Sequence, residues 1–201
     1  MENTIESPTI TFAIASIDRH FEEIIQLQRS NHHQALSPDQ QVENGFLFAE
    51  HTVDILKKMA VRMPQIIALN KERVIGYNLA MDQSMAGDLP MLTPMFQEFE
   101  KCNYKGKPLS QYPFMVGGQV CVDKQFRGMG LLRSLYEEAR KSVNDRFQMC
   151  VTEISVRNEI SLKAHQKMGF KIAGSYDDGR EMWHIVVWEF NEKQDPDDET
   201  L

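Results

Sequence analysis

VCVDKQFRGMGL, at residues 120–131, is the stretch of sequence that decides the fold. It joins the end of an apolar, β-prone run to a turn and then to a helical stripe of apolar residues that begins at Leu131. The first amides of a helix have no partner within the helix, and together with the helix dipole they attract anions. Gly128 and Gly130 lack a Cβ, so phosphate oxygens can approach this backbone closely. Arg127 adds positive charge, and the turn is predicted to cradle a diphosphate.

Two glycines after a strand also occur in ordinary tight turns, so this pair alone does not decide the function. The chain has no Gly-x-x-x-x-Gly-Lys-Ser/Thr motif for a nucleoside triphosphate, and no Gly-x-Gly-x-x-Gly opens a first β-α unit for a dinucleotide. The surrounding elements must therefore decide which anion fits.

The elements after residue 113 form a β-α-β unit. Strands are predicted at 114–122 and 148–156, with a helix from 131 to about 147 between them, so the two strands should be parallel neighbours. A short helix follows at 160–168, and Gly169 occupies the place of a left-handed cap residue. Runs at 170–175 and 182–190 are typical of a final hairpin.

The first half of the chain predicts a strand, two helices and a hairpin. Periodicity and capping residues place them at 9–15, at the helix after Ser16, at 53–63, and at 65–70 with 73–81. Segment 82–113 shows no strand signal, although Thr93-Pro94 starts a short helix, and we interpret it as an insertion before the fourth strand.

Length and composition favour one domain at 1–190 followed by an acidic, disordered tail at 191–201. The formal charge of -7 opposes nucleic-acid binding. The chain shows no signal peptide and no apolar run long enough to span a bilayer. Three cysteines without metal-ligand or CxxC spacing fit a reducing compartment, so we expect a cytoplasmic protein without a metal site.

Two ordered motifs resemble the GNAT superfamily of N-acetyltransferases. QFRGMG at 125–130 is similar to the family signature Gln/Arg-x-x-Gly-x-Gly/Ala. NEISLKAHQKMGF at 158–170 is similar to the segment in which an Asn follows the fifth strand and a Gly-Phe ends the next helix. The clear resemblance covers roughly residues 114–190, whereas the first half matches only in its order of elements.

The resemblance implies an α/β fold: a mixed, strongly twisted central sheet with helices on both faces, whose parallel fourth and fifth strands splay apart to admit acyl-CoA. The main chain of Val120 and Val122 would pair with the pantetheine arm and polarise the thioester carbonyl. The implied cosubstrate is acetyl-CoA. Dimers are frequent in this superfamily, so the resemblance also allows for a homodimer. The implied coenzyme residues are Val120, Cys121, Val122, Gln125, Phe126, Arg127, Gly128, Met129, Gly130, Leu131, Asn158 and Ser161.

Two residues are candidates for proton transfer. A lysine-like ammonium costs roughly 4 to 5 kcal/mol to deprotonate at pH 7, so a base or a desolvating pocket must help. Glu153 resembles the glutamate that deprotonates the acceptor in ribosomal-protein alanine acetyltransferases; the alternative is a carboxylate paired with an arginine or facing water. His165 stands where many relatives have a tyrosine that protonates the departing thiolate. It could donate a proton, merely pack, or leave that step to water.

Three other residues carry alternatives. Cys121 could form an acyl-enzyme, but no His or acid accompanies it locally, and buried cysteines usually belong to the core. Asn158 can cap the short helix, bind the pantetheine arm, or do both. His32-His33 invites a metal interpretation, yet no third ligand is evident and surface exposure explains the pair better.

We expect direct transfer of an acetyl group to a primary amine in a ternary complex. The acceptor should enter between residues 31–48 and the insertion, and a small molecule is favoured; a peptide acceptor or a noncatalytic acyl-CoA-binding module are the alternatives. The insertion supplies apolar side chains that would wall a pocket or form a satellite core: Met85, Met91, Met95, Phe96, Phe99, Tyr104 and Tyr112.

Overall fold

The computed structural model describes residues 8–143 and 146–191. Short 3-10 turns connect several of its elements. The helices and strands, in chain order, are β1 (Ile10–Ile14), α1 (Asp18–Ser30), α2 (Pro38–Asn44), α3 (Val53–Arg62), β2 (Ile66–Asn70), β3 (Arg73–Met81), α4 (Thr93–Lys101), β4 (Asn103–Tyr104), β5 (Lys107–Pro108), β6 (Phe114–Val122), α5 (Leu131–Ser142), β7 (Met149–Ser155), α6 (Glu159–Gln166), β8 (Lys171–Asp177) and β9 (Met182–Glu189).

Seven strands form one mixed sheet in the order β1-β2-β3-β6-β7-β9-β8. The predicted fourth and fifth strands are β6 and β7; they are parallel, and the other neighbours in this sheet are antiparallel. Their pairing is limited to three residue pairs, from Phe114↔Met149 to Val116↔Val151. Both strands continue beyond that point, so they diverge, as predicted, and the divergence places the site.

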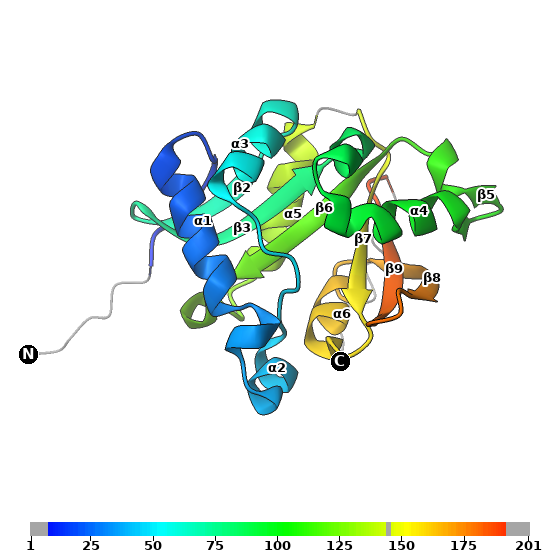
Figure 1. Cartoon of the computed structure of the whole chain (residues 1–201). Coiled ribbons are helices and arrows are strands. Elements are labelled where there is room, and N and C mark those ends of the chain that lie inside the picture. The colour runs from blue at the N-terminus through cyan, green and yellow to red at the C-terminus, as the bar shows by residue number, and fades with distance from the viewer. Residues whose placement is uncertain (1–7, 144–145, 192–201) are drawn as a thin grey trace, which may run out of the picture.

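Helices cover both faces of the sheet (Figure 1). Helices α1 and α3 contact each other and β3, whereas α5 contacts β2, β3 and β6. On α5 the buried side chains are Leu131, Leu135, Tyr136 and Ala139, at helical spacing, and they belong to the core on that face. The predicted α/β fold, with a mixed sheet between two helical layers, is confirmed.

Several boundaries differ from the prediction. Helix α2 was not predicted. Ser37 forms a capping box with Gln40 at its start, and Pro38 is well suited to the first helical turn. Helix α5 ends at Ser142 instead of near residue 147. The predicted tail lies, apart from Asn191, outside the described residues.

The insertion 82–113 contains a strand pair that the sequence did not predict. Strands β4 and β5 form a hairpin through Lys105 and Gly106, whose φ angles are 48° and 82°. Two positive φ values are typical of a type I′ turn, and a lysine is an unusual residue for its first central position. Two residues are too few to show the alternation of apolar and polar side chains by which a strand is recognised in a sequence.

Candidate active site

The opening between β6 and β7 begins at a pair of glycines. The Thr152 hydroxyl donates to the Gly117 carbonyl oxygen at 2.6 Å, close to the last parallel pair. A register shift between Leu79 and Ala80 leaves Gly118 without a partner on β3. A Cβ at Gly118 would stand 3.2 Å from the Leu79 carbonyl oxygen and would collide with the Met81 side chain, so glycine is required at this bulge.

The turn that enters α5 fits an anion. Gly128 and Gly130 have φ angles of 78° and 76°, and no heavy atom of the described chain lies within 4 Å of a Cβ built on either. Gly130 is the N-cap and offers no side-chain bond, so the first amides of α5 remain available. Phe126 anchors the turn in the core below α5. These features match a diphosphate cradle.

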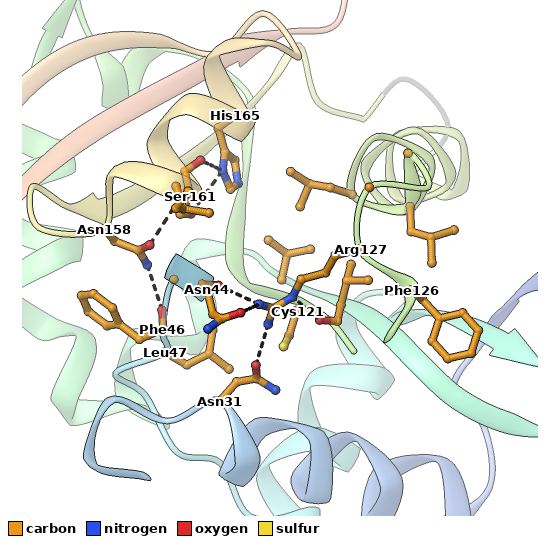
Figure 2. Close-up of a pocket in the computed structure, with 18 residues that line it drawn as sticks. Asn31, Asn44, Phe46, Leu47, Cys121, Phe126, Arg127, Asn158, Ser161 and His165 are labelled. Atoms are coloured by element: carbon orange, nitrogen blue, oxygen red, sulfur yellow. Dashed lines mark hydrogen bonds between the residues drawn. The ribbon is translucent and has the colours of Figure 1, made fainter. Parts of the chain in front are cut away.

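A cavity of about 210 Å³ lies beside this turn (Figure 2). Ten of the twelve predicted coenzyme residues line it; Gln125 and Met129 do not, and both are exposed. Seven further lining residues were not predicted from the sequence as coenzyme residues: Asn31, Asn44, Gly45, Phe46, Leu47, Leu132 and Ile160. Most of these come from the connection around α2, whose place over the opening depends on tertiary packing.

Arg127 is bonded to that connection instead of projecting into the turn. Its guanidinium donates to the Asn31 side-chain oxygen at 2.7 Å and to the Asn44 carbonyl oxygen at 2.9 Å (Figure 2). Its Nε donates to the Val122 carbonyl oxygen at 3.1 Å. Most N–H donors of Arg127 are therefore already bonded to protein acceptors, and few remain for the anion that Arg127 was predicted to attract.

Asn158 holds the same connection from the other side. Its side-chain nitrogen donates to the Phe46 carbonyl oxygen at 2.9 Å, while its oxygen caps α6 at the Ser161 amide, 3.4 Å away. Residues 44–47, which we call the strap, thus run between Arg127 on the turn and Asn158 at the start of α6 (Figure 2). The strap borders both cavities of the site.

A second cavity, of about 590 Å³, lies on the other side of the strap. Its lining includes Leu92, Pro94 and Met95 from the insertion. Phe48 and Trp183 also line it, and their rings meet edge to face with centroids 5.0 Å apart. Side chains of chain segments distant in sequence therefore form this cavity.

The apolar inventory of the insertion is divided between cavity and core. Met95 lines the cavity and is also part of the core. Met85, Phe96, Phe99 and Tyr104 are buried in the core, with Tyr112 packed against it, and the side chain of Met91 lies outside the described set. The insertion thus supplies part of the cavity wall, while its other apolar side chains pack into the main core and do not form a separate satellite core.

Glu153 faces the larger cavity and is partly buried. The Tyr176 hydroxyl donates a hydrogen bond to its carboxylate. Burial raises the pKa of Glu153 to about 7; the Tyr176 hydrogen bond opposes this shift and the charge of Asp178 adds to it. A carboxylate that titrates near neutrality can accept a proton from an amine that is bound next to it.

His165 lies between the two cavities but is buried, with both ring nitrogens engaged. Nδ1 is 2.7 Å from the Ser161 carbonyl oxygen, which requires a proton on that nitrogen. Nε2 then accepts from the Tyr136 hydroxyl at 3.0 Å. Burial lowers the pKa of His165 to about 4, so the ring is neutral at pH 7. This arrangement favours packing and positioning over the proton donation that the sequence left open.

Cys121 does not resemble an activated nucleophile. Burial raises the pKa of its thiol to about 12, despite the nearby charge of Arg127. Thiolate is the reactive form, so this side chain is inert at neutral pH. The structure supports the core interpretation of Cys121.

A buried amide network fixes the floor of the larger cavity. Gln119 accepts from the Tyr77 hydroxyl at 2.7 Å and donates to the Ala49 carbonyl oxygen at 2.9 Å. Gln28 donates to Gln119 at 2.5 Å and accepts from the His51 amide at 2.8 Å. These bonds position the segment after the strap before any ligand arrives.

The described residues form neither a metal site nor a membrane-spanning helix. Within residues 8–143 and 146–191, no group of three His, Cys, Asp or Glu side chains is arranged to hold a metal ion. His32 instead bonds the Phe48 carbonyl oxygen through Nε2 at 2.9 Å. No helix among the described residues has the length and apolarity needed to cross a membrane.

No protein-family model matches the sequence, and no curated protein matches it. Solved structures do match the fold. A chain of the NatC complex bound to Gag peptide and CoA superposes with a TM-score of 0.61 at 14% identity, covering 90% of this chain and 98% of that one. The ribosomal-protein alanine N-acetyltransferase of Escherichia coli gives 0.59 at 11%, covering 94% and 98%.

An acetyltransferase of the GNAT family from Streptococcus pneumoniae gives a TM-score of 0.57 at 16% identity, with 90% of this chain and 99% of that chain covered. These matches extend over nearly the whole length of both proteins, including the first half, where sequence motifs were weak. Together with the diverging β6 and β7 and the anion-ready turn, they lead to one conclusion: this chain has the fold of the GNAT acetyltransferases.

Proposed function

We propose that this protein transfers an acetyl group from acetyl-CoA to a small molecule that carries a primary amine. The observation that carries the proposal is the size and lining of the larger cavity, whose volume of about 590 Å³ lies in the range of about 300 to 1,000 Å³ typical of small-molecule sites. Apolar and aromatic side chains such as Leu92, Met95 and Phe48 line it beside Glu153. A pocket of this form suits a small acceptor better than an extended peptide.

The proposed division of labour follows from the two cavities. Acetyl-CoA supplies an activated thioester, and the amides at Gly128 and Gly130 would hold its diphosphate. The diverging edge of β6 at Val120 would orient the pantetheine arm and place backbone donors at the carbonyl oxygen. Ser161 and Asn158 border the same cavity and would contact that arm.

Glu153 would accept the first proton from the bound ammonium, which leaves a neutral amine. Its nitrogen then forms a bond to the acetyl carbon while the carbon–sulfur bond breaks. The departing thiolate takes up the second amine proton, so one proton is released to solvent for each amide formed. A base with a pKa near 7 is suited to this cycle, because it both accepts and releases protons at neutral pH.

A peptide amino terminus is the second candidate acceptor, because two structural neighbours point to it. One is bound to a Gag peptide, and another is named for acetylating an alanine of a ribosomal protein. In this chain, the larger cavity has the volume of a small-molecule site, and an extended peptide would have to reach beyond it. The size of the cavity therefore favours a small acceptor over a peptide.

The test has two stages. Calorimetry with acetyl-CoA should give saturable binding, and a thiol-release assay should then show turnover with small primary amines. A mixture of short peptides with varied amino termini, assayed at the same amine concentration, should be slower. Binding without turnover on either set would indicate an acyl-CoA-binding module, and absence of binding would remove the proposal altogether.

A further inference from the structure

The proposed function leaves the class of amine open, and the register of the last three strands narrows it. Glu153 and Ser155 alternate on β7 and point to the same face of the sheet. Ser155 pairs with Trp183 on β9, and Trp183 pairs with Tyr176 on β8. Directly paired residues share a face, so Glu153, Trp183 and Tyr176 all project into the larger cavity.

This juxtaposition is suited to an organic cation. Trp183 is the diagonal cross-strand neighbour of Glu153, a relation that places their backbones about 7 to 8 Å apart. Both side chains line the same cavity, where a carboxylate and an aromatic ring together can hold an ammonium group and the carbons attached to it. The Tyr176 hydroxyl is bonded to the same carboxylate and keeps it oriented.

The charges around Glu153 favour an acceptor that carries no anionic group. Asp178 is the charged neighbour that acts on Glu153, and it has the same sign. Arg157 also lines the cavity, but its guanidinium is bound to both carboxylate oxygens of Glu181, so this pair is locally neutral. Arg180 also lines the cavity and is exposed beside Asp178. The lining therefore carries three carboxylates against two guanidiniums, which gives it net negative charge.

The same charges do not provide for a second ammonium group. Asp178 already accepts from the backbone amides of Arg180 and Glu181, both at 2.8 Å, and from the Trp183 indole at 3.1 Å. Glu181 is consumed by Arg157 and by the Ser155 hydroxyl at 2.9 Å. A diamine or polyamine would thus find one available carboxylate.

The rest of the cavity is apolar or aromatic. Leu92 and Met95 line one wall, and Phe46 and Phe48 line the other with their rings 5.3 Å apart. From these features, and resting on the proposed function, we infer that the acceptor is a primary monoamine on an uncharged, apolar or aromatic body. Its ammonium binds at Glu153 beside Trp183, and its body lies against Phe48 and Met95.

Four amines of known chemistry test this class in the thiol-release assay: 2-phenylethylamine, phenylalanine, spermidine and a tetrapeptide. The first should exceed the others by at least about 30-fold in kcat/KM, because phenylalanine adds a carboxylate next to two like charges and spermidine adds unpaired ammonium groups. A preference for phenylalanine or spermidine overturns the inference, while the proposed function survives. A preference for the tetrapeptide overturns both the inference and the small-molecule acceptor.

A binding measurement separates the class from the activity. Calorimetric titration of 2-phenylethylamine into the CoA-saturated protein should show Trp183→Leu weakening the amine Kd about tenfold without changing the Kd of acetyl-CoA. Trp188→Phe is the matched control, because Trp188 packs on Phe170 in the core and does not line the cavity. Equal Kd values in wild type and Trp183→Leu would overturn the assigned position.

A size test gives a third outcome. Leu92 is partly buried and lines the cavity on the side of the insertion, so Leu92→Ala should enlarge the cavity and shift the best substrate from 2-phenylethylamine toward 4-phenylbutylamine. An unchanged chain-length preference would mean that the body does not lie toward the insertion. If acetyl-CoA itself fails to bind, the proposed function fails first, and that result is distinguishable from every outcome above.

Discussion

The two cavities that meet where β6 and β7 diverge are assembled in opposite ways. The smaller cavity, where we propose that acetyl-CoA binds, comes largely from one continuous stretch, from Val120 through the turn to Leu132. The larger cavity, where we propose that the amine binds, is lined by the segments around α2, the insertion, β6, β7, α6 and the β8–β9 hairpin. A local motif can therefore specify the first, whereas the second depends on how distant segments pack.

The strap joins these two regions. Residues 44–47 all line the smaller cavity, and Phe46 and Leu47 also line the larger one. The strap is held by Arg127 from the turn and by Asn158 at the start of α6. Gly45 adopts a φ of 67°, and a Cβ there would stand 2.8 Å from the Asn158 side-chain oxygen. Mutations can thus show whether the cavities act separately or through the strap.

The largest expected effect is on the coenzyme side alone. Gly128→Glu should weaken acetyl-CoA binding at least about 1000-fold, because it adds a side chain and a negative charge where the diphosphate would lie. Calorimetry measures this directly. Gly106→Glu is a matched control, since Gly106 also has a positive φ of 82° and open space around it, but lies in the β4–β5 hairpin. Equal loss in both variants would point to backbone strain and not to the cradle.

The next effect should fall on the acceptor side alone. Glu153→Gln should lower kcat about 100-fold or more and leave the acetyl-CoA Kd unchanged. A base works when ionised, and burial raises the pKa of Glu153 to about 7, so the wild-type kcat/KM should fall as the pH drops below about 7. The Gln variant should lack this acidic limb.

Glu159→Gln provides the control for the loss of a carboxylate. Glu159 is exposed at the start of α6 and is paired with Lys163 at 2.8 Å, so its removal should preserve both kcat and the pH profile. If the Glu153 variant kept the wild-type rate and the same acidic limb, another group would have to be the base.

A smaller effect is expected when a change at the smaller cavity alters the binding of the amine in the larger one. Arg127→Lys should raise the KM of the amine about tenfold at saturating acetyl-CoA, because a lysine cannot reproduce the planar bonds to Asn31 and Asn44 that hold the strap. Steady-state kinetics with the amine varied provides the measurement. Arg133→Lys on α5, where the native side chain donates only to the Lys167 carbonyl oxygen at 2.8 Å among the described bonds, should leave this KM unchanged.

The smallest effect tests whether the protein backbone or a side chain serves the coenzyme at β6. Cys121→Ala should change kcat by less than about threefold, since the thiol has a pKa near 12 and is not reactive. Intact-mass measurement of the wild type mixed with acetyl-CoA in the absence of amine should detect no acetylated protein. An acetylated Cys121, with loss of turnover in the alanine variant, would establish a covalent route instead.

The sequence by itself determined the β-α-β unit and the anion turn. Strand β6, helix α5 and the glycines between them are contiguous, and the conformations required of Gly128 and Gly130 follow from local sterics and helix-end hydrogen bonding. Ten of the twelve residues predicted for the coenzyme line one cavity, and their contact with a coenzyme stays a prediction. Helix α2 was not predicted, although the sequence contains its capping box, Ser37 followed three residues later by Gln40, with Pro38 between them.

Only the tertiary structure decided the rest. That Arg127 holds the strap, that Phe48 meets Trp183, and that Tyr176 reaches Glu153 are relations between segments far apart in the chain. The charge state of Glu153 likewise depends on burial, which no spacing reveals. Local conformation is encoded by neighbouring residues, whereas the shape and field of a cavity arise from long-range packing, so the coenzyme side was predictable and the acceptor side was not.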